Sequence, residues 1–266
     1  MSIRTCPKCQ KRKFYRVRRG KLRCKNCLYE FKPRLGSLRL TKRQWKRFLT
    51  WFVLGHSLRI IKEQTKLSHY SVFKAARITR RLMLKDVPGD FEGIVEVDET
   101  YLGGQKKNKR KSQLRKEKRK YGDSKKGFGT TKQPVFGILC RSGKVYAELV
   151  NKTEAKDLIP IITKRVKSGA RICSDTWRAY TGLATKGYVH RTVEHNQKEY
   201  VKGKNHINGL EGFWGYLKRK LAAKGGVQRK YLYLFLGEYV WRYNHRQMNT
   251  KEKVNRLLNL MEDFSG

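Results

Sequence analysis

The spacing of hydrophobic and polar positions changes twice along the chain and divides it into three parts. The first residues contain no apolar run long enough for a core, and the following apolar residues recur at helical spacing. From Gly93 onward the apolar residues gather in short runs that are typical of strands. The sequence therefore predicts an N-terminal segment over 1–36, a helical domain over 37–88 and an α/β domain over 89–266.

Three helices are predicted in the helical domain. Thr41 can cap the first, whose apolar face runs from Trp45 to Phe52. A shorter helix is expected over 57–66, with Leu58, Ile60 and Ile61 facing inward. A longer basic helix starts at Ser68 or His69, and this order is typical of a helix-turn-helix. Its side chains expected to contact DNA are His69, Tyr70, Ser71, Lys74 and Arg77. The alternative is a plain three-helix linker domain.

The α/β domain has the element order of an RNase H-like fold. The predicted elements are strands at 93–98, 134–140, 144–150, 170–175 and 189–193, and helices at 154–166, 177–183 and 209–221. Three successive strands followed by alternating helices and strands predict a mixed five-stranded sheet with helices. The aromatic, helical segment after Arg229 is expected to pack on this sheet rather than to stack on bases.

The charge of the chain indicates which class of molecule it binds. Lys and Arg total 64 against 21 Asp and Glu, a formal net charge of +43, which a folded chain tolerates best beside a polyanion. Nucleic acid is the expected partner, with salt-dependent binding, although ribosomal proteins are equally basic. The N-terminus lacks an apolar leader and no apolar run could span a bilayer, so we expect a cytoplasmic, nucleoid-associated protein without a membrane partner.

The densest positive charge lies between the first two predicted strands of the α/β domain. Twelve of the 22 residues over 105–126 are Lys or Arg, among them Lys109, Arg110 and Lys111. The segment has no apolar period, so we expect a mobile loop that becomes ordered on DNA, the alternative being a solvated spacer.

Four of the six cysteines form two Cys-x-x-Cys pairs. Cys6, Cys9, Cys24 and Cys27 flank a predicted strand and a turn at Gly20, the arrangement of a zinc ribbon that binds one structural Zn²⁺. A segment too small for a core would take its folding energy from the metal. A pair of disulfides is the alternative. Cys140 and Cys173 lie in apolar runs and are expected to be buried bystanders.

Three acidic residues stand where a site is expected. Asp98 and Asp175 end predicted strands, and Glu211 lies early in a helix with Lys218 two turns further on the same face. Converging carboxylates can hold two Mg²⁺ or Mn²⁺ ions for phosphodiester chemistry, and a Lys can contact a phosphate. Glu96 shares the strand face of Asp98 and is its rival. Asp175 could instead cap the following helix.

Two polar residues shortly before Glu211 could also take part in the site. Asn208 and His206 could position the scissile phosphate, or Asn208 could cap the helix.

Four sequence stretches resemble the ISXO-like group of bacterial insertion-sequence transposases. They are Asp-Glu-Thr-Tyr-Leu-Gly-Gly at 98–104, Ser-Asp-Thr-Trp at 174–177, the stretch from Asn-His-Ile-Asn-Gly-Leu-Glu to Leu-Lys-Arg at 205–219, and Arg-Tyr-Asn-His-Arg at 242–246. The resemblance covers nearly the whole chain in the same order. It implies a DDE enzyme with an N-terminal zinc ribbon that cuts and joins DNA.

The resemblance also assigns residues and partners. It implies the triad Asp98, Asp175 and Glu211 with Lys218 beside it, and two divalent ions. Related elements sometimes use Asn as the third ligand, which keeps Asn208 a candidate. The substrate would be double-stranded DNA, both the element's terminal repeats and the target, and a homodimer or higher oligomer would assemble on it.

Two other functions remain open from the sequence. A metal-dependent nuclease with the same acids would cut DNA without strand transfer. A DNA-binding regulator would use the ribbon and the helix-turn-helix alone, although three intact acids argue against it.

Overall fold

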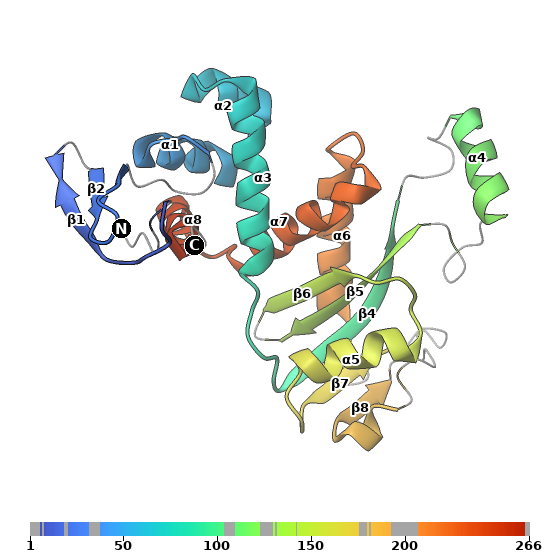
Figure 1. The fold of residues 1–266 in the computed structure, drawn as a ribbon. Coiled ribbons are helices and arrows are strands. Elements are labelled where there is room, and N and C mark those ends of the chain that lie inside the picture. The colour runs from blue at the N-terminus through green and yellow to red at the C-terminus, as the bar shows by residue number, and fades with distance from the viewer. Residues whose placement is uncertain are drawn as a thin grey trace. The chain divides into compact units, whose positions relative to one another are not determined.

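The computed structural model describes residues 6, 8–18, 21–31, 38–103, 110–122, 130, 132–141, 143–175, 180, 182–192 and 207–263. These residues divide into two compact units, one formed by 1–86 together with 245–266 and the other by 87–244 (Figure 1). Gly20, Lys109 and His206 lie outside the described residues, and so does most of the short helix expected over 177–183. Across the described residues, no helix has both the length and the apolarity needed to cross a bilayer.

The first unit begins with a small antiparallel sheet. Strands β1 (Phe14–Val17), β2 (Lys21–Cys24) and β3 (Glu30–Phe31) pair in that order. The rings of Phe14 and Phe31 meet edge to face with their centroids 5.5 Å apart. So little apolar surface cannot support a fold by itself, as the sequence suggested. The rest of this segment is organised around the cysteines described below.

Three helices follow at nearly the predicted positions. They are α1 (Lys42–Val53), α2 (Leu58–Thr65) and α3 (His69–Lys85). Thr41 caps α1 in a reciprocal capping box with Gln44, and Ser57 and Ser68 cap α2 and α3 through their hydroxyls. One inward residue was predicted wrongly: Ile61 is buried, but Ile60 is 38% exposed, because it lies one position before Ile61 and therefore on a different side of the helix.

The C-terminal helix belongs to the first unit, which differs from the predicted boundary of 89–266. Helix α8 (Thr250–Asp263) packs against α1 and α3. It buries Val254, Leu257 and Met261, and Arg256 donates two hydrogen bonds of 2.6 Å to the Asp86 carboxylate. The sequence order concealed this because an amphipathic helix does not reveal which domain receives its apolar face.

The second unit is built on a mixed five-stranded sheet. Its strands are β4 (Ile94–Leu102), β5 (Gln133–Cys140), β6 (Lys144–Leu149), β7 (Arg171–Ser174) and β8 (Val189–Thr192). They lie in the order β6-β5-β4-β7-β8, with the first three antiparallel and β4, β7 and β8 parallel. All five match predicted strands, and the topology is compatible with an RNase H-like domain.

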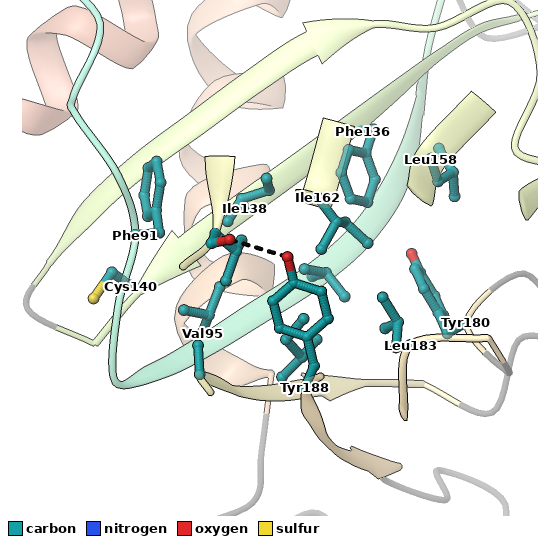
Figure 2. Close-up of a cluster of buried hydrophobic side chains, with 14 of the residues drawn as sticks. Phe91, Val95, Phe136, Ile138, Cys140, Leu158, Ile162, Tyr180, Leu183 and Tyr188 are labelled. Carbon is teal, nitrogen blue, oxygen red and sulfur yellow. Dashed lines mark hydrogen bonds between the residues drawn. The ribbon is translucent and has the colours of Figure 1, made fainter. Parts of the chain in front are cut away.

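Each face of this sheet has its own core. Helix α5 (Ala155–Arg165) covers one face, where its Leu158 and Ile162 pack with Val95, Phe136 and Ile138 of the sheet (Figure 2). The Tyr188 hydroxyl in this core donates a 3.0 Å hydrogen bond to the Val166 carbonyl. Both cysteines outside the pairs, Cys140 and Cys173, are buried in the sheet as expected.

The opposite face is covered by α6 (Asn208–Ala222) and α7 (Leu232–Asn244), the latter entered through a short 3₁₀ turn, Arg229–Tyr231. Leu236 and Tyr239 of α7 are buried against Val145 and Ala147. The Asn244 side chain exchanges two hydrogen bonds of 2.8 Å with the Val145 backbone. The aromatic segment therefore packs on the sheet, as predicted.

The basic segment between β4 and β5 is partly a helix. A loop was predicted over 105–126, but residues 111–121 form the helix α4 (Lys111–Tyr121), so the prediction is wrong there. Residues 104–109 and 123–129 lie outside the described residues. Lys, Arg, Gln, Leu and Glu all have high helix propensity, which forms a helix without any apolar period. Arg110 precedes this helix without a side-chain capping bond.

Candidate functional site

Strand pairing places two of the three predicted acids level with each other. In the parallel pair β4–β7, Glu96 lies opposite Cys173. Asp98 and Asp175 each follow two residues later, and neighbouring strands are about 4.8 Å apart. Both carboxylates thus stand at one edge of the site, Asp98 within β4 and Asp175 directly after the end of β7.

Helix α6 brings the third acid to the same place. Its first turn lies over β4, where the Leu210 amide donates a 2.8 Å hydrogen bond to Glu96 Oε2. Glu211 is the next residue, exposed, and its charge acts on Asp98. The close approach depends on Gly209, since a Cβ there would lie 2.9 Å from Glu96 Oε2.

Glu96 shares the face of Asp98, as strand alternation predicted, but it has a separate role. Its side chain is 1% exposed, accepts from the amide of Leu210 and lies 3.5 Å from the Arg141 guanidinium. A carboxylate at a helix N-terminus satisfies an amide that has no partner within the helix. Glu96 therefore anchors the first turn of α6.

Trp214 holds Asp98 and was missed from the sequence. Its indole Nε1 donates a 2.9 Å hydrogen bond to Asp98 Oδ2. The indole rests on Gly137, the residue opposite Asp98 in β5, where a Cβ would lie only 2.5 Å from the ring. A glycine inside a buried strand is a sequence signal for such close approach.

Burial and crowding make the site unfavourable for negative charge. The pKa of Asp98 is raised to about 7 by burial and by the charges of Asp175 and Glu211, against the opposing hydrogen bond from Trp214. Burial likewise raises the pKa of Glu99 to about 8, although the Tyr180 hydroxyl donates to this carboxylate. A cation bound between these acids would favour their ionised forms and offset the repulsion between them.

The donor set therefore fits hard divalent cations, because Asp98, Asp175 and Glu211 offer only carboxylate oxygens. Among the described residues, the acids do not form a ligand group as tight as that of the cysteines. Lys218 is exposed on α6, two turns beyond Glu211. Asn208 is exposed as the first residue of α6, and the capping alternative is wrong: Ile207 occupies the cap position without a side-chain bond.

The four paired cysteines form a second candidate metal site. The Sγ atoms of Cys6, Cys9, Cys24 and Cys27 all lie within 4.8 Å of one another, with 3.5 Å between Cys6 and Cys27 and between Cys9 and Cys24. Tetrahedral zinc with Zn–S bonds of about 2.3 Å separates its sulfurs by about 3.8 Å. All four thiols are free rather than joined as disulfides. The cluster thus fits a zinc ribbon.

The two pairs repeat one backbone geometry. The amides of Lys8 and Asn26 each approach the first sulfur of their pair at 3.4 Å. Gln10 and Leu28, which follow the second cysteines, both adopt a left-handed backbone with φ of 58° and 56°. Two equal tight turns that aim sulfurs at one point are a metal-binding arrangement.

Helix α3 presents most of the residues predicted to contact DNA. His69, Tyr70 and Arg77 are exposed, whereas Ser71 and Lys74 are half-buried. Phe73 was missed although it is 52% exposed and lies between Tyr70 and Arg77 on the same helix face. Arg110 and Lys111 are exposed at the start of α4.

Most of the second unit matches a known protein family. Residues 90–244 match the family model of the ISXO2-like transposase domain. A transposase-like protein of Haemophilus influenzae is 30% identical over 43% of this chain and 93% of its own length. A protein in the transposable element ISH50 of Halobacterium salinarum is 27% identical over 95% of this chain and 90% of its own length.

Proposed function

This chain belongs to the family of ISXO2-like transposases, and we propose that it cuts and joins DNA at the ends of an insertion sequence, using Asp98, Asp175 and Glu211 to hold two divalent ions. The observation that carries the proposal is the convergence of these acids from β4, the end of β7 and the first turn of α6. Burial, and then the charges of Asp175 and Glu211, raise the pKa of Asp98, so a cation bound at this point would stabilise the ionised carboxylates.

Bound there, two Mg²⁺ or Mn²⁺ ions would supply the Lewis acidity that activates the attacking oxygen and stabilises the leaving oxygen of a phosphodiester. The residues of the chain perform the positioning. Asp98 and Asp175 fix one side of the site from the rigid sheet, and Glu211 closes it from α6. Lys218, exposed beyond Glu211, would contact a phosphate as a point charge.

The proposed reaction has two steps at one site. Water would first attack the phosphodiester at each element end, which frees a 3′ hydroxyl. That hydroxyl would then attack the target DNA, and no covalent bond to the protein is required. Both steps displace an oxygen from phosphorus, so a single set of carboxylates serves both.

DNA binding is proposed for both units. The net charge of +43 favours a polyanionic partner, and double-stranded DNA at the element ends and target would be that partner. Helix α3 would read the terminal repeats through its exposed face, and Arg110 and Lys111 would contact phosphates together with Lys109. The cysteine cluster would bind one Zn²⁺ and fold the N-terminal segment. Two ends must be joined together, so we propose a homodimer or larger assembly on DNA.

A joining assay tests the proposal. Purified protein is incubated with Mg²⁺, a labelled duplex that carries the inverted repeats flanking the gene, and a supercoiled target plasmid. We expect cleavage at the repeat ends and insertion of the label into the plasmid. Cleavage without insertion would indicate a nuclease, and binding without cleavage would indicate a regulator. Either result would overturn the proposal.

A further inference from the structure

The Asp98 carboxylate is held by a hydrogen bond from helix α6. Trp214 Nε1 donates to Asp98 Oδ2 at 2.9 Å, across a separation of 116 residues in sequence. A hydrogen bond to one oxygen fixes the rotation of the carboxylate group about its Cβ–Cγ bond. Groups that orient a metal ligand in this way govern metal affinity although they do not touch the metal.

The position of the indole is itself determined by β5. Gly137 lies directly opposite Asp98 in the β4–β5 register. A Cβ on Gly137 would meet Cζ2 of the indole at 2.5 Å and Cη2 at 2.6 Å, closer than side-chain atoms approach. Only glycine therefore lets the ring lie flat enough on the strand for Nε1 to reach Asp98.

The same helix carries Glu211, three residues before Trp214 and thus about one turn away. Glu96 fixes the start of this helix through the Leu210 amide. One helix therefore supplies one acid of the site and orients another. A shift of α6 would disturb both acids together.

We propose that Trp214 is a positioning residue that orients the Asp98 carboxylate for a divalent cation, and that Gly137 is the residue that makes this contact possible. The inference rests on the proposed function, because it concerns the same acids. It predicts a defect in metal affinity that is separable from loss of folding. Replacement of such an orienting group typically lowers metal affinity about 10- to 100-fold.

The test compares Trp214→Phe, which removes the N–H but keeps an aromatic ring, with Trp241→Phe as the matched control. Trp241 lies in α7 of the same unit and is 1% exposed, so its replacement opens a comparable gap in a core. Mn²⁺ binding is measured by the electron paramagnetic resonance signal of the free ion, on full-length protein. The loss of free-ion signal that Asp98→Asn still causes measures Mn²⁺ binding elsewhere on the chain.

We expect Trp214→Phe to weaken the Asp98-dependent Mn²⁺ binding about 10- to 100-fold. The Mn²⁺ concentration that gives half-maximal cleavage should rise by a similar factor. Trp241→Phe should leave both quantities unchanged even where the melting temperature falls. Substitution of Trp214 by its benzothiophene isostere, which keeps the ring shape without the N–H, should reproduce the defect without loss of packing.

A second test uses a variant of Gly137. Gly137→Ala should weaken Mn²⁺ binding in the wild-type background because it displaces the indole. In the Trp214→Phe background it should add less than about twofold, since the two ring atoms that it would meet most closely are gone and only Leu210 Cδ1, at 3.1 Å, remains near. Independent, additive effects of the two changes would contradict the proposal.

The outcomes also separate this inference from the proposed function. Unchanged Mn²⁺ affinity in Trp214→Phe and in the isostere, with wild-type cleavage intact, would overturn the role of Trp214 alone. Wild-type protein that neither binds Mn²⁺ through Asp98 nor cleaves DNA would overturn both.

Discussion

The two candidate metal sites of this chain are built in opposite ways. The cysteine cluster takes its four ligands from residues 6 to 27, each pair supplied by one tight turn, and its sulfurs already lie within 4.8 Å of one another. The acid site takes its three carboxylates from β4, the end of β7 and α6, with Asp98 and Glu211 more than a hundred residues apart. The cysteine site is local, whereas the acid site depends on the whole α/β unit.

The difference extends to what surrounds the ligands. Among the described residues, the support of the cysteine sulfurs comes from nearby backbone, including the amides of Lys8 and Asn26. The acids are held by side chains from other elements: Trp214 bonds to Asp98, and Glu96 anchors the helix that carries Glu211. A cluster in a segment without a core needs metal in order to fold, whereas acids on a packed sheet are positioned before any metal arrives. Loss of metal should therefore unfold the first site and only inactivate the second.

Neutralising the acids should give the largest effect. Asp98→Asn, Asp175→Asn and Glu211→Gln should each lower metal-dependent cleavage by at least about a thousandfold, because a metal centre supplies several kcal/mol of transition-state stabilisation. The melting temperature should not fall, since each change removes crowded negative charge. The measurement is end cleavage in Mg²⁺ and Mn²⁺, with repeat binding as the control. Activity that survives in Asp98→Asn would make Glu96 the next residue to examine.

Removing zinc should act on structure instead. Cys24→Ser should lose the bound zinc and leave the N-terminal segment open to protease, because apparent zinc affinities of about 10–16 kcal/mol supply the folding energy of such sites. Metal analysis of purified protein and limited proteolysis measure the two effects, and the α/β unit should stay protected. Cys173→Ala, a buried cysteine outside the cluster, is the matched control. Zinc near zero in wild-type protein with a protected N-terminus would refute the prediction.

The neighbours of Glu211 should give smaller effects. Lys218→Ala should slow cleavage by roughly 10- to 100-fold, equivalent to one hydrogen bond between charged groups, and the metal concentration for half-maximal activity should not change. Asn208→Ala should be milder than Glu211→Gln. Kinetics at varied Mg²⁺ separate the two kinds of defect. If Glu211→Gln were fully active and Asn208→Ala inactive, Asn208 would be the third ligand.

The smallest effect concerns pH and stability. In the fold the pKa of Asp98 is about 7, above its ordinary value of 3.8, so this group favours folding at low pH and loses that contribution as pH rises toward 7. Asn at this position carries no charge at any pH. Relative to wild type, Asp98→Asn should therefore gain up to a few degrees in melting temperature between pH 5 and pH 8, in buffer without Mg²⁺.

Added Mg²⁺ should remove that gain by stabilising the wild-type carboxylates at pH 8. Thermal melts at the two pH values, without chelator so that zinc is retained, make the measurement. A difference between the two proteins that is independent of pH would show that Asp98 ionises freely in the fold.

Much of this architecture could be predicted because its signals are local. Cysteine spacing, the caps at Thr41 and Ser68, and the apolar runs of the five strands all act within a few residues, where propensity and capping decide the outcome. Asp175 and Glu211 could be named because one follows a strand and the other lies in the first turn of a helix. Asp98 was expected to end its strand, but β4 continues to Leu102 and Asp98 lies in its middle. The prediction of a loop where α4 forms was wrong, because a segment without an apolar period can still form a helix when its residues have high helix propensity.

Tertiary structure alone decided the remaining features. The assignment of α8 to the first unit, the bond from Trp214 to Asp98 across Gly137, and the role of Glu96 at the start of α6 all join segments far apart in sequence. Periodicity shows that a face is apolar or that a carboxylate is buried, but it does not identify the partner. The partner is fixed by close packing, in which each side chain must fit the space that the others leave.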